Sequence, residues 1–110
     1  MPEFVQVQTT TASEEDARRI ARALVEERLA ACVQIVGPIT STYWWQGRIE
    51  SSQEWLCCIK TSQALYASVE STVLNLHPYD EPEILATPVV AGSDGYVKWL
   101  VTELKSETED

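Results

Sequence analysis

The segment from residue 77 to 84, HPYDEPEI, concentrates side chains that can do chemistry. It holds the chain's only histidine, His77, followed by Asp80, Glu81 and Glu83. Imidazole and carboxylate groups are ligands for copper, zinc or nickel, so one interpretation is a divalent-metal site. The other is a rigid connector, because two prolines fix its backbone and the carboxylates then face water. The spacing matches no closed ligand motif, so the residues alone leave both interpretations open.

The three cysteines limit what a metal site can contain. Cys32 has two interpretations. It can supply a thiolate ligand for Cu(I) or Zn, or it can be a buried free cysteine that packs like a small apolar residue. Cys57 and Cys58 are consecutive in a strand-like segment, so they point to opposite faces and cannot ligate one ion together. A turn at 46–47 would place Cys32 opposite Thr61, so a site with two cysteines needs a second subunit. The candidate metal ligands are His77, Cys32, Asp80 and Glu83.

Composition excludes several classes of partner. The 110 residues carry a formal charge of -9, with 17 acidic side chains against 8 basic ones. Binding to a phosphate backbone needs basic patches, so nucleic acid is excluded. No apolar run approaches the roughly 20 residues of a membrane span, and the start MPEFVQVQ has no signal-peptide pattern. An odd number of cysteines suits a reducing compartment, so we expect a cytoplasmic protein without nucleic-acid or membrane partners.

Hydrophobic periodicity predicts the elements that must position these residues. In order, they are a strand over 4–10, a helix after the cap Ser13 that extends through Arg28, a hairpin over 32–61, a helix over 62–76, a strand over 83–91 and a helix over 93–105. Proline ends the second helix at His77, and Pro88 indicates an edge strand. The order predicts a single α+β domain over 1–110 of ferredoxin-like β-α-β-β-α-β type. A C-terminal helix is added, and about 105–110 is expected to be a disordered acidic tail.

The central hairpin is unusually long, with strands of about 14 residues against a usual 5 to 6. Gly37-Pro38 interrupts its first strand, which indicates a bend or bulge. Its outer part carries Tyr43, Trp44, Trp45 and Ile49. A domain of this size cannot cover both faces of such a hairpin, and exposed aromatic ribbons aggregate. We therefore expect a homo-oligomer with these four residues at the interface.

Five segments together resemble the CutA divalent-cation-tolerance family: RLAACVQI, STYWWQGRIE, EWLCCIKT, HPYDEPEI and YVKWL. The resemblance runs from Val5 to about Leu104. It implies a ferredoxin-like homotrimer whose long hairpins pack between subunits, with an architecture similar to PII-type signalling trimers. It also implies binding of copper and other divalent ions, no catalytic reaction and no obligatory cofactor. Asp80 stands where the family commonly has Glu, and Glu81 where it has an apolar residue, so local negative charge is higher here.

Four further side chains in the family-matching segments can line a cleft between subunits: Glu54, Lys60, Tyr79 and Trp99. The plainer interpretation is that Glu54 and Lys60 are charged side chains on one face of a strand. Tyr79 and Trp99 would then be packed rings whose polar atoms have hydrogen-bond partners. Two other functions remain. One is a regulatory trimer that binds a small organic effector or a protein partner in this cleft. The other is an acylphosphatase-type hydrolase with a cysteine nucleophile, which the lack of a phosphate loop argues against.

Overall fold

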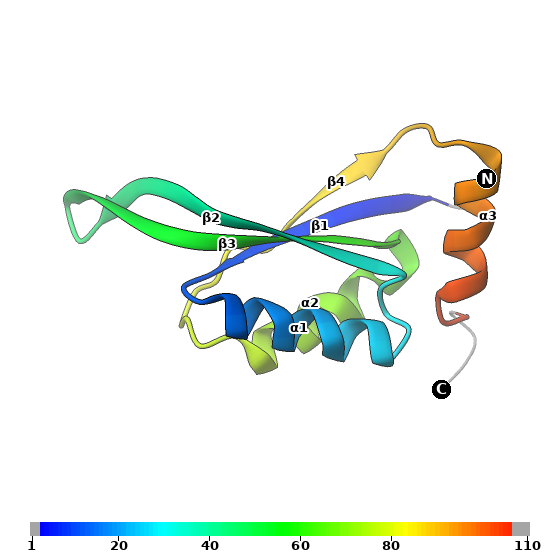
Figure 1. Cartoon of the computed structure of the whole chain (residues 1–110), viewed down its shortest axis with the longest axis horizontal. Coiled ribbons are helices and arrows are strands. Elements are labelled where there is room, and N and C mark those ends of the chain that lie inside the picture. Colours follow the sequence, from blue (N-terminus) through cyan, green and yellow to red (C-terminus); the bar gives the residue numbers. More distant parts are fainter. Residues whose placement is uncertain (1–2, 107–110) are drawn as a thin grey trace.

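The computed structural model describes residues 3–106 and has the predicted α+β order (Figure 1). Its elements are β1 (Phe4–Thr11), α1 (Glu14–Glu26), β2 (Cys32–Trp45), β3 (Arg48–Ser62), a 3₁₀ turn (Gln63–Leu65), α2 (Tyr66–Leu76), β4 (Leu85–Val89) and α3 (Asp94–Glu103). The four strands form one antiparallel sheet in the order β2-β3-β1-β4. This order is that of a ferredoxin-like sheet, as predicted.

Helix α1 begins where the sequence predicts. The Ser13 hydroxyl accepts a hydrogen bond from the Asp16 N–H at 3.1 Å, and three acidic residues occupy the first turn. The predicted end was wrong, because α1 stops at Glu26 and Arg28 has a left-handed φ of 57°. The turn lets Leu29 bond back to the Leu24 carbonyl at 3.0 Å. Arg28 therefore lies beyond the helix and not on its apolar face.

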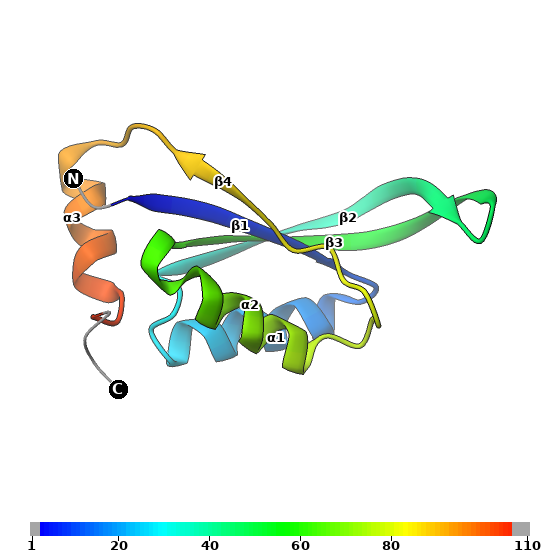
Figure 2. The ribbon, with the colours of Figure 1, turned by 180° about the vertical axis from the view of Figure 1, so that it is seen from behind.

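The core lies between the sheet and two helices. Helices α1 and α2 cover one face of the sheet and leave the other uncovered (Figures 1 and 2). The largest fully buried apolar side chains come from both layers: Val7, Ile20, Leu24, Ile59, Val69 and Val73. Burial of each such side chain stabilises the fold by about 1.5–3 kcal/mol. The body of the sheet is thus held mainly from the helix side.

The connection from α2 to β4 follows the proline pattern. α2 ends at Leu76, and the following His77 has an extended ψ of 133° directly before Pro78. β4 pairs only with β1, and Pro88 sits opposite Val5 on this edge strand. The edge position predicted from Pro88 is confirmed, since an edge strand tolerates the missing N–H.

The hairpin has the predicted turn and the predicted bulge. Gln46 and Gly47 have φ of 49° and 78°, the left-handed pair of a type I′ turn. The register shifts between Val36 and Ile39, so Cys32 pairs with Lys60. The expected pairing of Cys32 with Thr61 was wrong, because the bulge adds one residue to β2.

Glycine is required at the bulge. A Cβ on Gly37 would lie 2.3 Å from the Cδ1 atom of Trp55, so any larger residue displaces the indole or the backbone.

Beyond the bulge, β2 and β3 project from the body as an arm, which we define as residues 39–54 (Figure 1). The arm exposes its apolar side chains, with relative exposures of 41% for Tyr43, 72% for Trp44, 59% for Trp45 and 65% for Ile49. The predicted exposure of these four residues in a single chain is confirmed.

The C-terminal part lies at the other end of the sheet. Helix α3 stands opposite the arm, and the Lys105 N–H donates to the Arg28 carbonyl at 2.8 Å (Figure 1). Most of the predicted acidic tail, residues 107–110, lies outside the described residues. Within residues 3–106, no helix is long and apolar enough to cross a membrane.

Candidate functional site: an acidic groove beside the arm

His77 is buried and both of its ring nitrogens are hydrogen-bonded. Nε2 donates to the Thr10 carbonyl at 2.7 Å, and Nδ1 accepts from the Tyr79 N–H at 3.1 Å. These partners fit the neutral imidazole protonated on Nε2. Neither nitrogen has a free lone pair directed at a ligand in this arrangement. The histidine therefore fastens the α2–β4 connection to β1, as the rigid-connector interpretation expects.

Tyr79 and Glu54 join that connection to the arm. The Tyr79 hydroxyl donates to Glu54 Oε2 at 2.8 Å, and Glu54 is only 8% exposed. Burial raises the pKa of the Tyr79 phenol, and the adjacent Glu54 carboxylate raises it further. Among the described residues, no Lys or Arg forms an ion pair with Glu54. A nearly buried carboxylate is thus held by a neutral donor alone.

The space between the arm and residues 79–83 is a groove of about 770 Å³, here called the acidic groove. Five carboxylates line it: Glu50, Glu54, Asp80, Glu81 and Glu83. Three aromatic side chains line it as well: Tyr43, Trp45 and Tyr79. Of the lining residues in the described part of the chain, none is Lys or Arg. Such a surface attracts cations, since none of the five carboxylates forms an ion pair with a Lys or Arg of residues 3–106.

The bulge directs the aromatic side chains into this groove. Before it, Ile35 packs against the core beneath the sheet. After it, Tyr43 pairs with Glu50 and Ile39 with Glu54, on the groove side. Alternation along a regular strand would have kept all the odd-numbered residues of β2 on one face. The one-residue shift therefore separates a core-facing half of β2 from a groove-facing half.

The predicted metal ligands do not come together within one chain. Asp80 and Glu83 line the groove, and Glu83 also accepts a hydrogen bond from Gln8 at 2.8 Å. Cys32 lies opposite Lys60, whereas His77 bonds to Thr10, which is opposite Leu56. Those β3 positions are four residues apart, or about 13 Å at 3.3 Å per residue.

Across residues 3–106, no three His, Cys, Asp or Glu side chains are grouped closely enough to hold an ion. Metal binding by this set stays a prediction that would require side chains to move or a second chain to contribute ligands.

The predicted cleft residues divide into two groups. Glu54 and Tyr79 meet in the groove. Lys60 donates to Gln6 Oε1 at 2.9 Å on the body of the sheet, and Trp99 on α3 lies 5.4 Å from the Tyr96 ring.

Sequence reasoning did not name Glu50 or Ser52 as site residues. Both line the groove, on the same strand and at alternate positions with Glu54. That same-face spacing was the signal available in the sequence.

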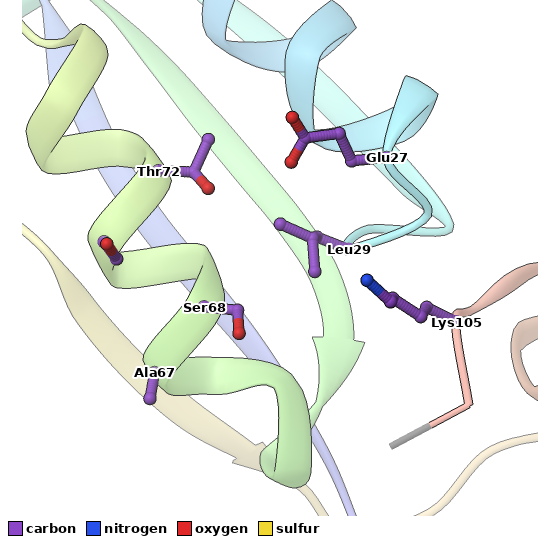
Figure 3. Close-up of a pocket in the computed structure, with 7 residues that line it drawn as sticks. Glu27, Leu29, Ala67, Ser68, Thr72 and Lys105 are labelled. Atoms are coloured by element: carbon purple, nitrogen blue, oxygen red, sulfur yellow. The ribbon is translucent and has the colours of Figure 1, made fainter. Parts of the chain in front are cut away.

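A second hollow, of about 400 Å³, lies between the end of α1, α2 and Lys105 (Figure 3). Ser68 and Thr72 line it from α2, opposite Glu27 and Lys105. It carries both signs of charge, and none of the described residues that line it is aromatic. The acidic groove is the better candidate because its charge is of one sign and it has aromatic walls.

The buried cysteine is unsuited to nucleophilic catalysis. Cys57 is fully buried, and its thiol contacts the Ala17 carbonyl at 3.8 Å. Burial, and secondarily Cys58, raises the pKa of the Cys57 thiol to about 11, so little thiolate exists at neutral pH.

Fold and groove together define a class: a ferredoxin-like domain with a protruding β-arm and an acidic, cation-attracting groove at its base. Residues 5–103 match the family model of the CutA1 divalent ion tolerance protein, and the chain belongs to this family. The divalent-cation tolerance protein CutA of Thermus thermophilus is 50% identical over 91 residues, which are 83% of this chain and 88% of that protein. Human protein CutA is 44% identical over 101 residues. That match covers 90% of this chain and 56% of the human protein, so the chain spans just over half of that relative.

Solved structures of the family have the same fold. The Thermus thermophilus Cut A1 structure superposes with a TM-score of 0.90 at 46% identity, covering 93% of this chain and 99% of the other. CutA1 of Oryza sativa gives a TM-score of 0.92 at 36% identity, covering 94% and 95%. The ferredoxin-like class and the family predicted from the sequence are both confirmed.

Proposed function

We propose that this chain is a non-catalytic, homotrimeric tolerance protein of the cytoplasm that binds copper-type divalent ions in the acidic groove. The family supports a relation to divalent cations. The observation that carries the proposal is the groove itself, which five carboxylates line and where no lining residue of the described chain is basic.

The side chains that line the groove determine which ligand atoms a divalent ion finds there. Asp80 and Glu81 are exposed loop carboxylates, so a hydrated cation contacts their oxygens first. Cu²⁺ and Zn²⁺ bind more firmly when nitrogen or sulfur ligands join the oxygens. The imidazole of His77 is engaged with Thr10 and Tyr79, so its recruitment costs two hydrogen bonds. Strong binding therefore calls for ligands from a neighbouring chain or for movement of the 77–84 connection.

The trimer is supported by the arm. Trp44 and Ile49 are among its most exposed side chains, and soluble chains seldom leave such a ribbon uncovered. Covering the arm with a second and third copy removes this apolar surface from water. The PII-type architecture that the family resemblance implies is part of the same proposal.

Calorimetric titration of Cu²⁺ and Zn²⁺ into the size-checked oligomer tests the metal site. The groove variant combines Asp80→Asn with Glu83→Gln, and the matched control combines Glu15→Gln with Asp94→Asn, which removes the same charge outside the groove. We expect binding of about one ion per chain, weakened about tenfold or more in the groove variant only. Equal weakening in both variants would mean that the overall negative charge attracts the ions, and the groove site would be abandoned.

A second candidate function is binding of a small organic effector, and the aromatic walls of the groove favour it. A volume of about 770 Å³ falls within the range of small-molecule pockets. Tyr43, Trp45 and Tyr79 offer ring faces that suit an organic cation. Under this alternative, organic amines raise the melting temperature more than Zn²⁺ does, and Trp45→Ala removes the effect.

A further inference from the structure

We propose that Arg48 of a second copy of this chain docks into the acidic groove and supplies the cation that one chain lacks there. The proposal rests on the homo-oligomer proposed above and assigns a partner residue to its site. Arg48 begins β3 at the exposed tip of the hairpin, next to the turn at Gln46 and Gly47.

Arg48 differs from every other arginine of the chain. Each of the others forms an ion pair on its own chain: Arg18 with Glu14, Arg19 with Asp16, Arg22 with Glu26, and Arg28 with Glu103. Across residues 3–106, Arg48 has neither an ion pair nor a side-chain hydrogen bond. One chain therefore presents an unmatched guanidinium at the tip of its arm and unmatched carboxylates in its groove.

The tip of the arm and the acidic groove are complementary in the types of side chain they carry as well as in charge. At the tip Arg48 pairs with the exposed Trp45, and the exposed Trp44 and Ile49 form the next pair along the hairpin. The groove combines carboxylates with the rings of Tyr43 and Trp45. A guanidinium forms paired hydrogen bonds with carboxylates and stacks on aromatic faces, which a Lys ammonium does less well. The groove thus offers both of the contacts that arginine is suited to make.

The homotrimer proposed above fixes the symmetry of such a contact. Two copies could exchange tips reciprocally in a two-fold dimer, but in a trimer the tip of each copy enters the groove of the next, head-to-tail, in a closed ring. In a ring every chain gives one tip and receives one, which leaves no arm uncovered. One guanidinium neutralises one of the five groove carboxylates, so the others can still attract a divalent ion. Arginine docking and metal binding are therefore compatible.

A charge-reversal cycle tests the docking. Arg48→Glu, Glu81→Arg and the two combined in one chain are compared with wild type by size-exclusion chromatography with light scattering over a dilution series. Lys98→Glu, on the exposed face of α3, makes the same change in charge as Arg48→Glu and is the control. We expect each groove or tip variant to dissociate at a concentration at least about tenfold higher than wild type. The combined variant should recover most of that loss, since its charges are again opposite.

The possible outcomes separate this inference from the proposed function. If wild type is an oligomer but Arg48→Glu dissociates no more readily than Lys98→Glu, the docking is overturned and the homo-oligomer stands. If Arg48→Glu dissociates and the combined variant does not recover, Arg48 pairs outside the groove, and the docking is again overturned. A wild type that is monomeric at every concentration contradicts both the docking and the homotrimer. The metal titration then decides separately whether the groove binds ions.

Discussion

The body of the sheet and the arm are built from the same two strands and are held in opposite ways. In the body, Ile59 of β3 is fully buried under α1 and α2. In the arm, Trp44 and Ile49 face water on the same hairpin. The body thus gains its stability within the chain, whereas the exposed apolar side chains of the arm can be covered only by another molecule. One continuous hairpin therefore serves two purposes, folding at one end and association at the other.

The largest expected effect breaks the body and spares the arm. Leu24→Ala should lower the free energy of unfolding by about 2–5 kcal/mol, because it opens a cavity in a fully packed site. Trp44→Ala should change it by less than about 0.5 kcal/mol in dilute, monomeric protein, since the side chain is 72% exposed and lies outside the core. Urea unfolding at low protein concentration measures both. A Trp44→Ala loss as large as that of Leu24→Ala would mean that the arm is part of the folding core.

A smaller effect is expected at the junction between the two regions. Tyr79→Phe should cost about 1–3 kcal/mol, because it leaves the buried Glu54 carboxylate without its donor. Tyr43→Phe is the matched control, since it removes a hydroxyl contact to Ser52 that is exposed.

The pH dependence of this loss has a definite sign. The pKa of Tyr79 is raised in the folded protein. The stabilisation that its hydroxyl gives the fold is therefore fully present below the ordinary pKa of tyrosine, and it is lost only as the pH rises through the raised pKa. The loss in Tyr79→Phe, measured by urea unfolding, should therefore be equal at about pH 7 and pH 9. A loss that shrinks over this interval would contradict the assignment.

The smallest expected effect is a gain in stability from a substitution in the body of the sheet. Thr9 Oγ1 is a buried side-chain atom without a hydrogen-bond partner in the described chain, so Thr9→Val should raise stability by about 1 kcal/mol. Thr61→Val, on the same layer of the core, should lower it by a similar amount, because the Thr61 hydroxyl donates to the Leu29 carbonyl at 2.6 Å. Melting curves of the two variants give the comparison. Shifts of the same sign in both would show that packing, and not hydrogen bonding, controls the site.

Local patterns predicted most of the fold. Ser13, Gly47 and Pro88 act through short-range backbone chemistry, and the cap, turn and edge strand that they predict are all present. The size of the register shift was not predictable, because Gly37-Pro38 marks a bulge without fixing how many residues it adds.

The candidate site was less predictable, because its contacts join distant parts of the chain. The partner of His77 Nε2 is the carbonyl of Thr10, 67 residues away, and no local pattern indicates that this imidazole is already engaged. Tyr79 and Glu54 are 25 residues apart and were both named from family-matching segments, but their direct contact follows only from the fold. Side-chain types therefore located the chemistry, and tertiary structure decided which groups are free to perform it.

The bulge at Gly37-Pro38 decides which face of the arm each later residue of β2 occupies. Side chains alternate with a period of two, and Gly37 and Pro38 together oppose the single residue Trp55, so the pair counts as one step of the alternation. A regular pairing of the same sequence would direct Thr42 and Trp44 into the groove in place of Tyr43 and Trp45, while the body before the bulge would be unchanged. Removal of one of the two bulge residues would instead restore a regular ladder and keep Tyr43 opposite Glu50. The bulge therefore absorbs the one residue by which this part of β2 exceeds β3, and the aromatic lining of the groove depends on it.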